Sequence, residues 1–371
     1  MDFLADLIDI VRGCFREDGI AYDGGGDPRE LAALYCETRI RRIIPRPREV
    51  HFSEEIHASL GRLVRETDPD ERGKALAAWR TVFTLRNCLA RGEEVTRFLS
   101  KGVAKATSKD GMLWDFGMHH FHLCRLLDDR ATFVERSDHL LFAITADDAA
   151  YFVDVRRHDD PERLGWVRQD LLRIVHSNWP ALVEHHELRG VAGDRLTDQE
   201  KQSLRQRHLN HVTEIGGKAI GPVGWGVMAN GSSAWCRVWG DKLIHEIKRH
   251  RRFFGGQPPE VRRALIEGGA KVAGKMEFRL MRMDDLSPSA ELLEALKEDR
   301  CLSKDLCGMG FVVVEATTGA PVVVVVEDWS CPALTDTYPL GSSKEVSYGG
   351  PAGAVSVRVQ GAAGGTGEER A

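Results

Sequence analysis

The stretch HLLFAITADDAAYFVDVRRH, residues 139–158, predicts two β-strands joined by a tight turn. Apolar and β-branched side chains dominate residues 139–145 and 149–158, and such runs are typical of strands that are at least half buried. Asp147 and Asp148 lie between them, where short polar side chains favour a hairpin connection. We therefore expect an antiparallel pair of strands here.

A third strand is expected just upstream of this pair, over residues 118–124 (MHHFHLC), so that the three form an antiparallel meander. Further upstream, Val50 and Phe52 alternate with polar residues and predict a short strand. Ser53 is a suitable N-cap for a helix whose first turn carries acidic residues. A second helix is expected over residues 68–94. The order strand, helix, helix, meander predicts an α+β fold with a small antiparallel sheet.

The regions on both sides of residues 48–160 are expected to form separate parts of the chain. Residues 1–47 predict an N-terminal helical segment, in which proline at the sequence Asp27-Pro28 opens a second helix. Residues 161–359 predict a C-terminal α+β accessory region. Residues 360–371 are rich in glycine and charge and predict a disordered tail. The elements predicted in the accessory region are helices over 162–176, 196–212, 241–251 and 258–273 and hairpins over 224–239 and 310–329.

The overall charge and the apolar content narrow the range of functions. The 371 residues carry a formal net charge of −5, which argues against a protein that coats nucleic acid through a basic surface. Local basic patches such as RIRRIIPRPR, residues 39–48, could still bind a polyanion. Every apolar run is far shorter than the roughly 18 residues that a membrane span needs, so we expect no membrane contact.

The cysteine pattern and the N-terminal sequence favour a cytoplasmic protein. Eight cysteines are scattered along the chain without a CxxC pair, which favours reduced thiols over a disulfide framework. The first residues lack both a basic n-region and a small-residue cleavage site, so they do not resemble a signal peptide.

The stretch DFGMHHFHLC, residues 115–124, concentrates three of the chain's 14 histidines in four positions. Because alternate residues of a strand share a face, we expect His120 and His122 to point one way and His119 the other. His158 ends the last strand of the meander and is expected to approach them. Imidazoles transfer protons near neutral pH, so these histidines could serve as base and acid when a ribose 2′-hydroxyl attacks its own phosphate.

Two arginines near the cluster, Arg125 and Arg136, could neutralise the charge that develops on that phosphate. Such a reaction needs no cofactor and leaves a 2′,3′-cyclic phosphate end. Two other interpretations stay open. The histidines could be structural, or His120 and His122 could bind zinc together with Asp115 or His158 as the third ligand.

Three tryptophans lie in GWGVMANGSSAWCRVW, residues 224–239. Trp225, Trp235 and Trp239 could stack on nucleobases, because every base offers a π-face to an aromatic ring. Packing in the core is the favoured interpretation for these large apolar side chains.

The order of elements resembles that of the RelE/ParE-like toxins of bacterial toxin–antitoxin systems. REVHFSEEIHASLGRLV, residues 48–64, is similar to the family's first strand and helix. LARGEEVTRFLSKGV, residues 89–103, is similar to the end of its second helix and the loop that follows. MHHFHLC, DHLLFAI and AAYFVDVRRHDD are similar to its three final strands. The resemblance covers residues 48–160.

The resemblance implies a metal-independent endoribonuclease of toxin or phage-defence type. It implies RNA or the ribosome as the target and an antitoxin or immunity protein as a partner. His158 matches the position at the end of the last strand where members often carry histidine or arginine, and His122 and His139 lie where others carry basic residues. Because some members lack ribonuclease activity, the resemblance also allows a non-catalytic binding or regulatory protein on this fold.

Overall fold

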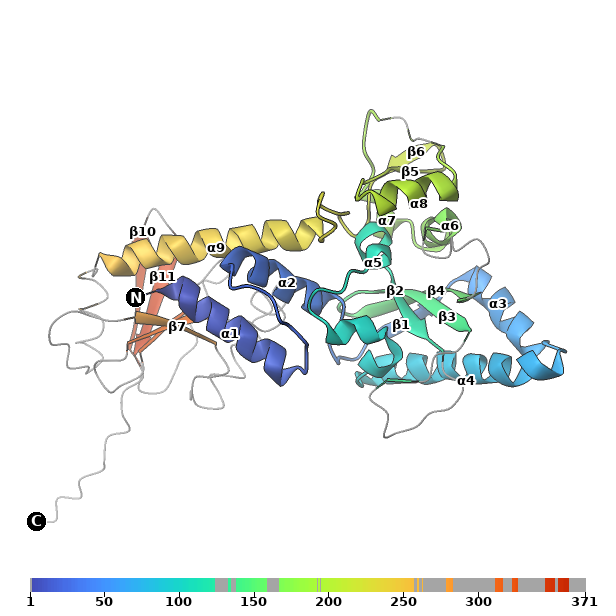
Figure 1. Cartoon of the computed structure of the whole chain (residues 1–371), viewed down its shortest axis with the longest axis horizontal. Coiled ribbons are helices and arrows are strands. Elements are labelled where there is room, and N and C mark those ends of the chain that lie inside the picture. Colours follow the sequence, from blue (N-terminus) through green and yellow to red (C-terminus); the bar gives the residue numbers. More distant parts are fainter. Residues whose placement is uncertain are drawn as a thin grey trace, which may run out of the picture. The chain divides into compact units, whose positions relative to one another are not determined.

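The computed structural model divides the chain into two compact units, which are described separately. One unit comprises Phe15–Asp23 and Ala33–Gly240, and the other comprises Met1–Cys14, Gly24–Ala32 and Asp241–Ala371. Figure 1 shows the elements of both. The residues that the structure describes are 2–123, 133–134, 138–158, 167–191, 193, 195–256, 259, 262, 278–282, 311–315, 322–325, 344–350 and 353–359.

The first unit is built on a four-stranded sheet with the strand order β1-β4-β3-β2. The strands are β1 (Glu49–Phe52), β2 (His119–His122), β3 (His139–Thr145) and β4 (Ala149–Arg157). The predicted antiparallel meander of β2, β3 and β4 is confirmed. However, β1 pairs with β4 in parallel, so the sheet is mixed and not antiparallel throughout as predicted. A parallel neighbour requires a long connection, which residues 53–148 between β1 and β4 provide.

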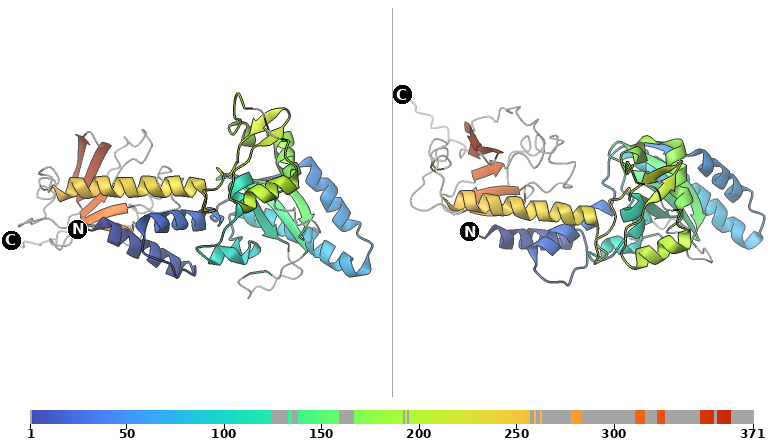
Figure 2. Two further views of the ribbon diagram at one scale, coloured as in Figure 1. Left: turned by 45° about the horizontal axis from the view of Figure 1, so that its top comes forward. Right: turned by 90° about the horizontal axis from the view of Figure 1, so that it is seen from above.

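Two helices follow β1 as predicted, and their ends are fixed by local side chains. Helix α3 (Glu54–Val64) begins after Ser53, whose hydroxyl accepts a hydrogen bond from the Ile56 amide. Helix α4 (Pro69–Arg91) begins after Asp68, whose carboxylate accepts from the Asp70 amide, and it ends before Gly92. The two helices lie side by side (Figure 2).

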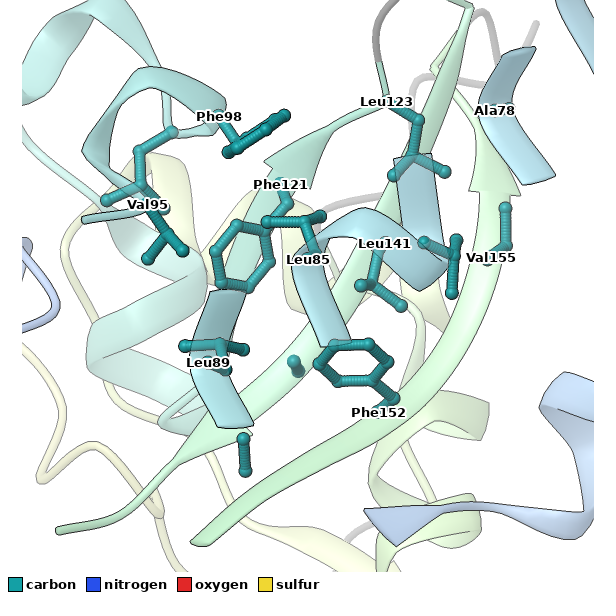
Figure 3. Packing of buried hydrophobic residues seen from close by; sticks show 14 of the residues in the cluster. Ala78, Leu85, Leu89, Val95, Phe98, Phe121, Leu123, Leu141, Phe152 and Val155 are labelled. Carbon is teal, nitrogen blue, oxygen red and sulfur yellow. The ribbon is translucent and has the colours of Figure 1, made fainter. Parts of the chain in front are cut away.

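One face of the sheet packs against α4 and forms the main hydrophobic core of this unit. Phe121 of β2, Leu141 of β3 and Phe152 of β4 point towards Leu85 and Leu89 of α4 (Figure 3). All five side chains are buried. Side chains of a strand alternate between the two faces of a sheet, so each strand presents every second residue to the helix.

The opposite face of the sheet is covered by short elements that precede and follow the meander in the chain, and it forms a second core. Leu140 and Phe142 of β3 meet apolar side chains of these elements there. Two of the elements form a β-hairpin whose Gly216-Gly217 turn has φ values of 59° and 79°, as a two-residue primed turn requires. This hairpin was not predicted from the sequence. Between α7 and β5 in the chain lies α8 (Asp198–Gln206), which contributes no residue to this core. The covering elements are α5 (Gly111–Phe116), α6 (Gln169–Asn178), α7 (Ala181–Glu184), β5 (Thr213–Ile215) and β6 (Lys218–Ile220).

The helices predicted over 162–176 and 196–212 are present as α6 and α8 with shorter bounds. Residues 159–166 lie outside the described part. Thr197 caps α8 in a reciprocal capping box with Glu200. The helix ends at Gln206, and the chain then leads into β5.

The predicted hairpin over 224–239 is wrong in its second half. A turn does form around Asn230, with a bridge between Val227 and Ser233. From Ala234 onwards, however, the chain is helix α9 (Ala234–Gly255). The Ser233 hydroxyl accepts from the Cys236 amide and starts the helix. The apparent strand pattern was one stripe of a helix, whose buried apolar side chains are Cys236, Trp239, Leu243, Ile244 and Ile247.

The second unit contains parts of α1 (Phe3–Glu17), α2 (Pro28–Ile40) and α9 together with a five-stranded sheet. Proline opens α2 as predicted. The predicted hairpin over 310–329 is confirmed, because β8 and β9 pair antiparallel. The predicted helix over 258–273 and the tail lie outside the described residues. The sheet order is β10-β11-β9-β8-β7, with β7 (Phe278–Arg282), β8 (Phe311–Glu315), β9 (Val322–Val325), β10 (Lys344–Gly350) and β11 (Gly353–Val359).

Within the described part of the chain, no helix is both long and apolar enough to cross a membrane.

Candidate functional site

Three histidines come together at the four-stranded sheet: two lie on β2 and the third directly follows β4. His120 pairs with Phe142 and His122 with Leu140, so both lie on the face of the second core. The ring centroids of His120 and His122 are 5.6 Å apart, and those of His122 and His158 are 6.0 Å apart. The structure therefore brings together the three histidines that the strand pattern singled out, which we call the histidine row.

The members of the histidine row differ in exposure. His122 is 3% exposed, His120 is half-buried and His158 is exposed. His120 and His158 can therefore meet a ligand, whereas His122 lies between them and contacts both rings.

His119 and His139 are buried and lie outside the row. On the opposite sheet face from His120, the His119 ring makes hydrogen bonds of 3.0 Å with the Ile40 carbonyl and with the Thr145 hydroxyl. Burial lowers the pKa of His119 to about 4, so its ring is neutral at physiological pH. These contacts give His119 a structural role.

A cavity of about 330 Å³ opens beside His120. Cationic and hydroxyl groups share its wall with a few apolar side chains. Three basic residues and one acid, Asp110, contribute to it, so the wall carries a surplus of positive charge. The lining residues are Arg41, Ser100, Gly102, Val103, Ser108, Lys109, Asp110, Gly111, Met112, His120 and Arg205.

Arg41 shapes the cavity wall and is committed to backbone carbonyls. Its Nη atoms donate to the carbonyls of Gly102, Lys105 and Ala106 at 2.9–3.1 Å, and its Nε donates to the Glu37 carbonyl at 3.0 Å. This side chain therefore ties the segment around Gly102 to α2.

Arg205 is held in place by Asp115. The Arg205 Nε donates to the Asp115 carboxylate at 2.5 Å, and the guanidinium lies 5.5 Å from the centre of the Phe116 ring. The Asp115 side chain is 4% exposed and that of Arg205 is 14% exposed. The ion pair therefore positions a cation in the cavity wall that His120 also lines.

A buried lysine and a buried histidine lie behind this ion pair. The Lys201 ammonium donates to the Thr213 hydroxyl at 2.6 Å and to the Val212 carbonyl at 3.2 Å. Burial lowers the pKa of Lys201 to about 8 and that of His211 to about 4. The negative charge of Asp115 opposes both pKa shifts, so it acts on Lys201 and on His211.

In the zinc alternative, Asp115 or His158 would join His120 and His122 as the third ligand. Arg205 already engages the Asp115 carboxylate. Among the described residues, no group of three or more His, Cys, Asp or Glu side chains is arranged to hold a metal ion.

The arginines predicted to assist, Arg125 and Arg136, lie outside the described residues. Arg205 and Lys109 occupy the cavity wall beside His120. Neither residue was predicted from the sequence to belong to the site. Arg205 is 90 positions from its partner Asp115, so tertiary structure alone brings the pair together. The one sequence feature that could have indicated a nearby cation is Asp115, because a carboxylate that is buried needs a positively charged partner.

A scan against protein-family models, a search of curated proteins and a search of solved structures each found no match for this chain.

Proposed function

We propose that the chain is a metal-independent ribonuclease whose reaction site is the cavity beside His120 and the histidine row next to it. The observation that carries this proposal is the contact of His122 with both His120 and His158 beside a positively charged cavity. Several imidazoles in contact supply what acid–base cleavage of RNA needs, namely one group that accepts a proton and another that donates one.

In the proposed reaction, the phosphodiester enters the cavity and His120 accepts the proton of the ribose 2′-hydroxyl. The 2′-oxygen then forms a bond to phosphorus, and the bond from phosphorus to the 5′-oxygen breaks. The imidazolium of His158, which His122 contacts, donates a proton to the leaving 5′-oxygen. The products are a 2′,3′-cyclic phosphate and a free 5′-hydroxyl, so protons and charge balance without a metal ion.

Two cations in the cavity wall suit the charge of the transition state. Arg205 is fixed by Asp115, and a guanidinium that is held in place does not have to reorganise as negative charge grows on the phosphate. Lys109 is exposed and its ammonium donates to the Asn230 carbonyl at 2.7 Å. Both can contribute to binding a polyanion although the chain as a whole carries a net charge of −5.

The test is cleavage of a labelled single-stranded RNA pool by the full-length protein in the presence of EDTA. His120→Ala and His158→Ala should each abolish most of the activity, whereas His57→Ala, at an exposed position on α3, should not change it. Cleavage that EDTA abolishes would point to the metal-dependent hydrolase. Absence of cleavage, with and without ribosomes, would point to a binding or regulatory protein on the same fold.

The proposal carries two further expectations from the family resemblance. A cytoplasmic antitoxin or immunity protein should bind this chain, and expression of the chain alone should arrest growth. The triple variant with all three row histidines replaced by alanine should relieve the arrest if cleavage causes it.

A further inference from the structure

Trp225 combines two features that are each unfavourable in a protein without a ligand. Its backbone has a φ of 68°, in the left-handed region that bulky side chains rarely adopt. Its side chain is also among the exposed large hydrophobic residues, at 63% exposure. Glycine would suit the backbone better and would remove the exposed ring. Strained backbone of this kind is concentrated at functional sites.

The surrounding chain holds Trp225 in this conformation. The Gly226 amide donates to the Trp114 carbonyl at 2.8 Å, and the Trp225 amide donates to the Pro222 carbonyl at 3.0 Å. A side chain at Gly224 would collide with backbone oxygens of α5, and one at Gly226 would collide with the Asn210 amide. The loop is therefore held against α5 on both sides of Trp225, so the backbone at the tryptophan has a fixed conformation.

The exposed indole has one aromatic neighbour among the described residues. The His186 ring lies 5.9 Å from it at an interplanar angle of 80°, and the His185 ring lies 4.1 Å from that of His186. Edge-on packing of this kind supports the indole and leaves at least one of its faces open. Burial and the neighbouring His185 lower the pKa of His186, so the supporting ring is neutral at physiological pH.

The same loop reaches the wall of the cavity. The Asn230 carbonyl accepts from Lys109, which lines the cavity, and α5 contributes Gly111 and Met112 to the same wall. The loop that carries Trp225 is thus hydrogen-bonded to α5, and α5 also lines the cavity that would hold a phosphodiester.

From this arrangement we propose that Trp225, supported by His186, is a stacking platform for an unpaired nucleobase of the single-stranded RNA whose phosphate enters the cavity. This inference rests on the proposed function for the identity of the ligand. An aromatic face with a neighbouring cationic site is the combination by which proteins bind single strands without sequence readout. The substrate class is therefore single-stranded RNA with little sequence preference at the stacked position.

The test measures binding of a fluorescein-labelled ten-residue oligouridylate by the full-length chain in a His120→Ala background, so that cleavage does not interfere. Trp225→Gly should weaken binding about tenfold or more, in line with the loss of one stacked base. The same substitution should raise the melting temperature, because it relieves the backbone and removes an exposed ring. Val64→Ala, at a similarly exposed apolar position on α3, should leave binding unchanged.

A second probe separates stacking from charge. An oligonucleotide of the same length with abasic sites keeps every phosphate, so the His120→Ala chain should bind it equally with and without Trp225→Gly. Binding of oligouridylate that is unchanged by Trp225→Gly, or no binding by the His120→Ala chain at all, would overturn the inference. Tryptophan-dependent binding by a chain that cleaves no RNA would support the platform while contradicting the ribonuclease.

Discussion

The imidazole rings of His122 and His158 lie 6.0 Å apart, although one residue ends β2 and the other follows β4. This contact joins an exposed histidine to a buried one. It also extends, through the contact of His122 with His120, to a cavity whose wall is positively charged.

His158→Ala is expected to lower the RNA cleavage rate by about 10²- to 10⁴-fold, the range typical for removal of a general acid or base. Because His158 is exposed, its loss should leave the melting temperature unchanged. The measurement is kcat against pH for wild type and variant. An acid role predicts loss of the high-pH limb of the wild-type profile, and a profile of unchanged shape and height would exclude His158 from proton transfer.

Arg205→Ala should destabilise the fold by about 3 kcal/mol, since it leaves the buried carboxylate of Asp115 without its ion-pair partner. The double variant Asp115→Asn/Arg205→Gln should recover most of that loss, because it removes both charges together. Urea unfolding of the three proteins gives the free energies directly. Equal destabilisation in the single and double variants would show that packing of Arg205 on Phe116 matters more than the ion pair.

Lys201 should make the fold more stable at alkaline pH relative to Lys201→Met. Its pKa is about 8 in the folded chain and about 10.5 when unfolded, so the unfolded chain binds more protons between these values. Stability of the wild type should therefore rise relative to the variant between pH 8 and 10.5, by up to about 3 kcal/mol. A difference that stays constant over this interval would show that the buried ammonium keeps its ordinary pKa.

His119 should make the fold sensitive to acid. Its pKa falls from about 6.5 unfolded to about 4 folded, so the stability that the neutral ring provides is lost as the pH drops from 6.5 towards 4. His119→Gln should lose some stability at pH 7 and should flatten this part of the pH dependence. Unfolding free energies at half-unit steps of pH would reveal the difference, and parallel curves for the two proteins would contradict the account.

Local signals allowed much of the first sheet and its helices to be predicted. The apolar runs of β3 and β4, the aspartates between them and the cap at Ser53 are each local features, so they are visible in the sequence. The face shared by His120 and His122 followed from strand geometry alone and is confirmed.

Other features depend on contacts between distant residues. The strand expected at Trp235 and Trp239 is helical, because Ser233 caps it and the buried stripe continues through Leu243. The parallel pairing of β1 with β4 could not be predicted, because the four residues of β1 do not specify which strand they pair with. Arg205 reaches the cavity through its contact with Asp115, which no local pattern reveals. The sequence therefore predicted the histidines of the candidate site, but it did not predict the cations around them.

The most direct test of the central claim is the chemistry of the RNA ends that the purified chain produces in EDTA. Mass spectrometry of the products of a short, defined single-stranded RNA distinguishes the possible ends. The account predicts fragments that end in a 2′,3′-cyclic phosphate and begin with a 5′-hydroxyl, and it predicts their loss in the variant with His120, His122 and His158 all replaced by alanine. Fragments with 3′-hydroxyl and 5′-phosphate ends, or cyclic phosphate that persists in the triple variant, would contradict it.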